Sequence, residues 1–192
     1  MAYLGDNRFA IADEGNVVNV VTIGDGVVQV EASAAGAQRY VPAAPPTRPN
    51  VGFEGVAYRP PRAGMAAGLF VCEEGTNGMG MSVLRFDYLP SAGRELDHAD
   101  GTLDVAEPWE ADTALANVAD DLAGMTYDTA NDTLIIVSER SDKLMRVGPA
   151  DGSLLEELPL VGSPQYEGVA LANEGRLVVV SEPNFVELFR AD

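Results

Sequence analysis

The stretch Gly124-Met125-Thr126-Tyr127, followed after a gap by Leu134-Ile135-Ile136-Val137-Ser138-Glu139, decides the fold because it recurs along the chain. Both halves are β-rich, and the gap Asp128–Thr133 (DTANDT) is typical of a tight turn between antiparallel strands. The pair therefore predicts a β-hairpin whose second strand ends in a glutamate. Three further copies match this pair: Met1–Tyr3 with Phe9–Glu14, Gly55–Tyr58 with Leu69–Glu74, and Gly168–Leu171 with Leu177–Glu182.

Further β-rich runs extend the hairpins, so that each unit holds three or four strands. These runs are Val17–Ile23, Val27–Glu31, Ser82–Tyr88, Lys143–Val147, Leu154–Leu160 and Phe185–Arg190. Repeated units of three or four antiparallel strands are the pattern of propeller blades. We therefore expect an all-β fold, a β-propeller of four-stranded antiparallel blades in which residues 1–192 form a single domain. Only Glu110–Asp121 (EADTALANVADD) has a helical composition.

The repeats are unevenly spaced, which predicts two insertions. The Pro-rich stretch Val41–Asn50 cannot be a central strand, and a second insertion covers about Ser91–Asp120. We expect both to form loops on a rim of the propeller. Because Met1 falls inside the first repeat, we also expect a ring of about four blades that is incomplete at its N-terminus. Either the native protein continues upstream, which we favour, or a second chain completes the ring.

Charge excludes some classes of partner. The chain carries 30 acidic and 12 basic residues, a formal net charge of -18, so nucleic acids and anionic membranes are poor partners. The excess acid indicates either a solvated acidic surface or a demand for cations.

Cys72 is the single cysteine, so no internal disulfide can form, and its β-rich flanks predict a buried structural thiol. Met1–Ala10 lacks the features of a signal peptide, and no run is long enough to span a membrane.

The acids of the repeats are the candidate site. Glu54 and Glu167 each precede the glycine that opens a first strand, and the strand-end glutamates are Glu14, Glu74, Glu139 and Glu182. Since adjacent antiparallel strands bring the start of one beside the end of the next, both acids of a unit should share one end of the sheet, and a ring should gather them on one face. The glycines would let the innermost strands crowd together, or adopt a backbone conformation closed to other residues.

Converging carboxylates repel each other by about 4 kcal/mol per close pair at an effective dielectric of ~20. A divalent cation, calcium first and magnesium second, would offset this with carboxylates, Asn184, backbone carbonyls and water as ligands. Protonation, solvent exposure and the capping of strand ends are the alternative explanations.

The sequence contains no G-x-S-x-G, glycine-rich phosphate loop or H-E-x-x-H motif, and its one histidine, His98, lies in the acidic insertion. Trp109 is either an exposed recognition residue or pins the insertion onto the barrel.

The segments Gln165–Ala170 and Val180–Asn184 resemble the bacterial SdiA-regulated (YjiK-like) β-propellers and, more distantly, the esterase-like phytase propellers. The resemblance implies a five-bladed propeller, exported or membrane-anchored through an N-terminal segment, with a metal site at the channel mouth. It places the family's acids on Glu54 and Glu167 and on the four strand-end glutamates. The chain departs from the family at Ala123, where a Glu is expected, and in lacking the first blade and the anchor.

We therefore expect a calcium-binding propeller that acts as an extracytoplasmic binding module for a small molecule or a protein. The alternative is a metal-dependent hydrolase of phosphate esters or lactones. A third hypothesis is a structural interaction protein that binds a partner through the insertions near Pro45 and Trp109. An oligomer follows if another chain completes the ring.

Overall fold

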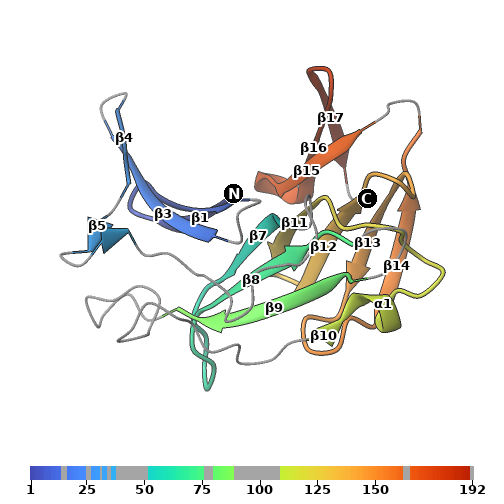
Figure 1. Ribbon diagram of the computed structural model, residues 1–192, viewed down its shortest axis with the longest axis horizontal. Helices are drawn as coiled ribbons and strands as arrows, with labels where there is room; N and C mark the ends of the chain where they lie inside the picture. The colour runs from blue at the N-terminus through green and yellow to red at the C-terminus, as the bar shows by residue number, and fades with distance from the viewer. Residues whose placement is uncertain are drawn as a thin grey trace.

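The computed structural model describes residues 1–13, 17–24, 27–30, 32–33, 36–37, 52–75, 80–88, 109–161 and 165–190. Four antiparallel sheets dominate it (Figure 1). They are β1 (Ala2–Gly5), β2 (Arg8–Asp13), β3 (Val17–Gly24) and β4 (Val27–Val30); β7 (Phe53–Arg59), β8 (Gly68–Glu73), β9 (Ser82–Asp87) and β10 (Trp109–Glu110); β11 (Gly124–Asp128), β12 (Thr133–Ser138), β13 (Lys143–Val147) and β14 (Leu154–Pro159); and β15 (Tyr166–Leu171), β16 (Arg176–Ser181) and β17 (Phe185–Arg190). A small pair, β5 (Ala32–Ser33) with β6 (Gly36–Ala37), stands apart.

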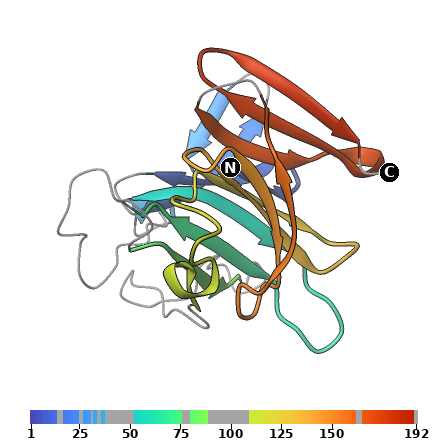
Figure 2. The same cartoon turned by 90° about the vertical axis from the view of Figure 1, so that its right-hand side faces the viewer.

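Each sheet pairs its strands in chain order, so every predicted unit is one sheet. The first strands β1, β7, β11 and β15 contact one another in that order, and the sheets follow one another around a common centre (Figures 1 and 2). The predicted β-propeller of antiparallel blades is confirmed.

The repeated glycines allow the first strands to approach closely. A Cβ on Gly55 would lie 2.7 Å from the backbone nitrogen of Met125, and one on Gly124 would lie 3.0 Å from the carbonyl oxygen of Glu167. Neither glycine has a positive φ. Of the two explanations that the sequence offers, close backbone approach is therefore the one that applies to Gly55 and Gly124.

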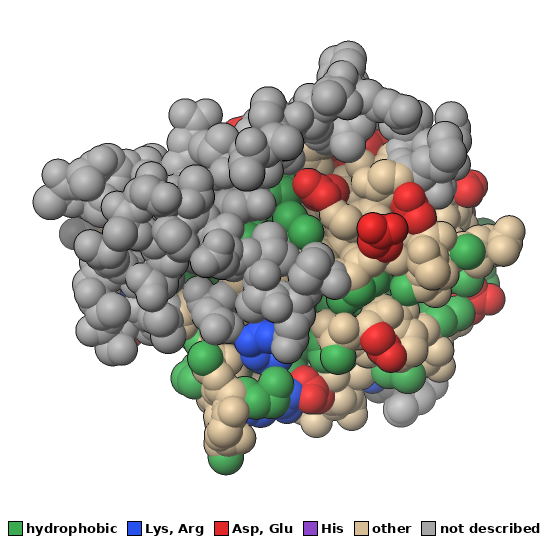
Figure 3. Space-filling model, turned by 60° about the horizontal axis from the view of Figure 1, so that its bottom comes forward, with side chains coloured by type: hydrophobic (Ala, Val, Ile, Leu, Met, Phe, Trp, Pro, Cys, Tyr) green, Lys and Arg blue, Asp and Glu red, His purple; other side chains and the backbone are tan. Residues whose placement is uncertain are grey.

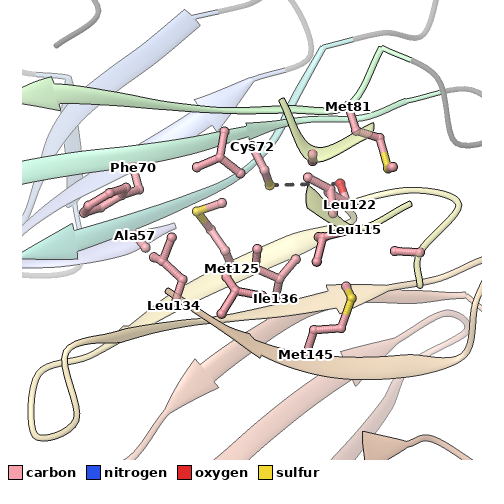
Figure 4. Packing of buried hydrophobic residues seen from close by; sticks show 14 of the residues in the cluster. Ala57, Phe70, Cys72, Met81, Leu115, Leu122, Met125, Leu134, Ile136 and Met145 are labelled. Carbon is pink, nitrogen blue, oxygen red and sulfur yellow. Dashed lines mark hydrogen bonds between the residues drawn. The ribbon is translucent and has the colours of Figure 1, made fainter. Parts of the chain in front are cut away.

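The core lies between the blades. Its largest cluster joins the second and third sheets and contains Phe70, Cys72, Met125 and Ile136 (Figure 4). Cys72 is fully buried, with its Sγ 4.0 Å from the carbonyl oxygen of Leu122. Burial, and next the charge of Glu54, raise the pKa of this thiol to about 12. The prediction of a structural thiol agrees with this environment.

The predicted helix over Glu110–Asp121 is wrong in extent. Only α1 (Ala111–Ala114) is helical, because Glu110 still pairs with β9 and Asn117 adopts a φ of 62°. The Asp112 carboxylate accepts hydrogen bonds of 2.6 Å from the backbone nitrogens of Gly80 and Met81. These bonds tie the segment to the second sheet instead of letting a helix continue.

Trp109 pins this segment. It is 7% exposed and packs so closely on Gly152 of the third blade that a Cβ there would meet its ring at 2.4 Å. The recognition role is therefore wrong, since the ring is buried.

The insertion Val41–Asn50, residues 91–108 with His98, and Glu14 lie outside the described residues. Within the described part, no helix is long and apolar enough to cross a membrane.

Candidate functional site

The start of each first strand lies beside the end of its partner, at what we call the acidic end of the sheets. In the second blade Phe53 pairs with Glu73, and the backbone nitrogen of Glu74 donates to the carbonyl oxygen of Gly52 at 3.1 Å. In the fourth blade the nitrogen of Glu182 donates to the carbonyl oxygen of Gln165 at 2.9 Å. The two acids of each of these blades therefore share one end, as the hairpin pattern predicts.

Irregular pairing occurs at both Glu-Gly steps. The register of β7 with β8 shifts between Phe53 and Gly55, and that of β15 with β16 shifts between Tyr166 and Gly168. Glu54 and Glu167 are the residues at these shifts. A β-bulge of this kind turns a side chain out of the regular alternation and is common beside functional sites.

Carboxylates from three blades act on Glu167. Its pKa is raised, first by partial burial and then by the negative charges of its neighbours, which in decreasing order of effect are Glu139, Glu182, Glu74 and Asp121. Glu74 belongs to the second blade, Asp121 and Glu139 to the third, and Glu167 and Glu182 to the fourth. A like charge raises the pKa of a carboxyl group in this way only at short range. These side chains therefore lie near one another, as a ring of blades requires.

Asp121 is the buried member of this acidic group. It is 1% exposed. Its Oδ1 accepts hydrogen bonds from the hydroxyl of Ser138 and from the backbone nitrogen of Arg140, the latter at 3.1 Å. Its Oδ2 is buried and has no hydrogen-bond partner within the described residues. A buried carboxylate oxygen without a donor is costly, so this oxygen is suited to a further positively charged ligand.

Among the described residues, the guanidinium of Arg140 partly balances the group. Arg140 forms an ion pair of 3.1 Å with Glu74 and donates at 3.3 Å to the carbonyl oxygen of Gly75. It therefore links the third blade to the second. The ion pair of Arg140 is with one of the five carboxylates, Glu74, so the acidic end keeps a strongly negative charge.

The structure thus gathers four of the predicted site residues: Glu74, Glu139, Glu167 and Glu182. The charge of Glu54 acts on Cys72. Asn184 is exposed, with a φ of 73°, in the turn between β16 and β17. Glu14 is not among the described residues, so its place stays a prediction.

Asp121 was not predicted. The expected family glutamate before Gly124 is Ala123, which is buried, and Asp121 supplies a carboxylate to the third blade from two residues further back. The signal that could have found it is the acidic pair Asp120-Asp121 placed directly before a first strand.

The acidic group fits a hard cation in its chemistry, since its ligand atoms are oxygens and one of them, Oδ2 of Asp121, is buried with no hydrogen-bond partner in the described part of the chain. Among the described residues, no three Asp, Glu, His or Cys side chains are grouped tightly enough to hold a metal ion as they stand. Glu167 and Glu182 are exposed, so their side chains are free to turn toward a cation.

Comparisons with known structures show the fold. The chain resembles a luciferin-regenerating enzyme with a TM-score of 0.53 at 13% identity, over 94% of this chain and 68% of that one. It resembles the glutaminyl cyclase of Myxococcus xanthus with a TM-score of 0.58 at 13% identity, over 100% and 72%. A protein of unknown function from Bacteroides caccae gives 0.50 at 11% identity, over 99% and 59%.

A search of curated proteins finds no significant match. The family model of the SdiA-regulated proteins, in contrast, matches residues 1–190. This match spans nearly the whole chain and agrees with the repeated hairpins, the propeller fold and the motifs around Glu167 and Glu182. The chain therefore belongs to the SdiA-regulated family.

Proposed function

We propose that this protein is a cation-binding propeller, with calcium as the first choice and magnesium as the second, and that it acts as an extracytoplasmic binding module. The observation that carries the proposal is the acidic group around Glu167. Partial burial and then carboxylates from three blades raise the pKa of Glu167, and the buried Oδ2 of Asp121 accepts no hydrogen bond from the described residues. A cation would remove both penalties at once.

Asp121 and Glu167 are the principal ligands in this proposal, and Glu139 and Glu182 complete the charge. Asp121 is held in place by Ser138 and by the backbone of Arg140, so it offers a preoriented oxygen. The exposed glutamates supply adaptable ones. A site of this kind, with few fixed ligands, belongs to the weaker range of calcium affinities, about 10⁻⁴–10⁻³ M, that is typical of extracellular modules.

Thermal unfolding in excess calcium, excess magnesium or a chelator tests the proposal. Binding to the native state alone stabilises it by about 2.7 kcal/mol at a ligand concentration of 100 Kd, so we expect a higher Tm in calcium. Calorimetric titration gives the affinity directly. An equal Tm in calcium, magnesium and chelator would show that the proposal is wrong.

Single-residue variants show which carboxylates the calcium-dependent rise in Tm depends on. Asp121→Asn keeps the shape and one acceptor, Glu167→Gln removes an exposed charge, and both should lose most of the calcium-dependent gain. Glu110→Gln is the matched control, because Glu110 is an exposed acid on β10 and is not among the described carboxylates that raise the pKa of Glu167. If Glu110→Gln loses as much as Glu167→Gln, calcium acts on the overall charge and not at this site.

A further inference from the structure

Equivalent residues of the second, third and fourth blades form the same row across their strands. Each row runs from the repeated glycine of the first strand to its partner on the second strand and on to the partner of that residue on the third. Directly opposed residues of antiparallel strands share one side of a sheet, and we call this side the leading face of a blade. The rows are Gly55, Cys72 and Val83 in the second blade, Gly124, Val137 and Leu144 in the third, and Gly168, Val180 and Val186 in the fourth.

The next blade covers the leading face of the second and third blades. Cys72 and Val83, both 0% exposed, belong to the core cluster shared with the third blade. Val137 and Leu144, at 0% and 3%, belong to the cluster shared with the fourth. The leading face is therefore the side by which one blade packs on its successor.

The leading face of the fourth blade is exposed to solvent. Val180 is 40% and Val186 is 65% exposed, although the equivalent residues of the two preceding blades are buried. Among the described residues, a Cβ on Gly168 would meet only the side chain of Val180, in its own sheet. A second row of this face consists of Ala170, Val178 and Leu188. The face therefore has the composition of a contact between blades and lacks the burial.

The first blade exposes the complementary side. In the third blade this side, which we call the trailing face, contains Met125 and Tyr127, which are 3% and 6% exposed in the cluster shared with the second blade. Met1 and Tyr3 stand at the equivalent positions of the first repeat and are 67% and 58% exposed. Figure 1 draws the first and last sheets on either side of the N-terminus, with no other described sheet between them.

The exposed leading face is uncharged in a strongly acidic chain. Both of its rows consist of Gly, Ala, Val and Leu, whereas the net charge is -18. Figure 3, which brings the bottom of Figure 1 forward, shows Asp and Glu side chains spread over that other surface. An apolar sheet face of this kind marks a contact with another protein surface. Every copy of the chain carries both an exposed leading face and an exposed trailing face, which are the two sides that pack together between its own blades.

We propose that this chain forms a dimer in which the leading face of the fourth blade of each copy packs on the trailing face of the first blade of the other. The two contacts are equivalent, so the pair has a two-fold axis and neither face remains for a further copy. The proposal is independent of the acidic end and does not rest on the cation proposal.

Size-exclusion chromatography with light scattering, over a range of protein concentrations in a chelator, tests the proposal. We expect twice the 20.2 kDa mass of the chain, and a larger share of dimer at higher salt, because salt screens the repulsion between two acidic copies. Val186→Asp on the leading face and Tyr3→Asp on the trailing face should each leave a monomer, since burial of an unpaired charge is costly. Leu155→Asp is the matched control, because Leu155 is 57% exposed on β14, outside both faces, and this variant should stay dimeric.

A mixture of the two altered chains tests whether unlike faces pair. In a mixed pair one contact combines both changes, while the other joins an unchanged leading face to an unchanged trailing face. The mixture should therefore regain a dimer that neither variant forms alone. If two leading faces paired with each other, Tyr3→Asp would stay dimeric and mixing would restore nothing, and the proposal would be wrong.

A wild-type chain that stays monomeric at every concentration would overturn the proposal, and so would a Leu155→Asp chain that dissociates as Val186→Asp does. Circular dichroism shows whether each variant keeps its β-sheet signal. If Val186→Asp does not fold, Leu188→Gln changes the same face more mildly and should raise the dimer Kd about tenfold or more, the scale of one buried leucine. An unchanged Kd for Leu188→Gln would equally contradict the proposed contact.

Discussion

At the scale of the residue, Glu167 combines exposure with an unfavourable charge. Partial burial is the first cause of its raised pKa, and the charges of four other carboxylates raise it further. Because the folded-state pKa is raised, the folded protein holds this proton at pH values where the unfolded chain has lost it. Its contribution to stability is therefore present below the ordinary glutamate pKa and is lost as the pH rises through the folded value.

Glu167→Gln should accordingly stabilise the protein at pH 7 in the presence of a chelator. We expect about 0.5 kcal/mol, the scale of an exposed charge interaction, and the difference should disappear below the ordinary glutamate pKa. Urea unfolding at both pH values measures it. In saturating calcium the order should reverse, because the variant has lost a ligand. A variant that is less stable than the wild type at pH 7 in chelator would contradict the expected sign.

At the scale of the element, the blades are joined by the close approach of their first strands. Gly55 of β7 faces the backbone of Met125 on β11, and Gly124 of β11 faces the backbone of Glu167 and Gly168 on β15. Backbone atoms cannot move aside as the end of a flexible side chain can. The glycines therefore set how closely the blades lie around the centre, and with that the convergence of the acidic end.

Gly55→Ala should destabilise the protein by about 1–3 kcal/mol, the usual cost of overpacking. Its Cβ would lie 2.7 Å from the nitrogen of Met125 and 2.8 Å from Sγ of Cys72. Gly24→Ala is the matched control, since a Cβ there meets nothing within 4 Å and Gly24 has no positive φ, and it should stay within about 0.5 kcal/mol of the wild type. Urea unfolding of both variants compares them, and equal losses would refute the close-approach explanation.

At the scale of the whole molecule, charge is distributed unevenly. The chain has a net charge of -18, the acidic end carries five carboxylates with Arg140, and Arg59, Arg62 and Arg85 gather toward the other end of the second blade. An excess of one sign opposes the compact state through self-repulsion. Salt screens this repulsion, since the Debye length falls from about 30 Å at 0.01 M to about 8 Å at 0.15 M.

Raising the sodium chloride concentration from about 0.01 M to about 0.15 M in the presence of a chelator should therefore raise the Tm. Differential scanning calorimetry measures the change, and tetramethylammonium chloride is the control, because screening depends on ionic strength and not on the identity of the cation. A falling Tm would mean that ion pairs such as Arg140 with Glu74 outweigh the net repulsion.

Local patterns account for most of the fold that could be predicted. Asp128 shows why: its Oδ1 accepts from the backbone nitrogens of Ala130 and Asn131, at 3.0 and 3.2 Å, so the turn is formed by the residues that predicted it. The helix after Trp109 failed as a prediction because the bonds from Gly80 and Met81 to Asp112 come from a distant part of the chain. Composition alone does not report such contacts.

The sequence by itself determined the repeat, the strands, the hairpin turns and the end of each sheet to which its acids belong, because these depend on neighbours along the chain and on the alternation of a strand. Only the tertiary structure decided that Asp121 joins Glu167 while Glu54 acts on Cys72, and that the leading face of the fourth blade is exposed. These outcomes depend on strand-register shifts and on the packing of one blade against the next, where burial and the addition of charges from separate segments fix which groups meet.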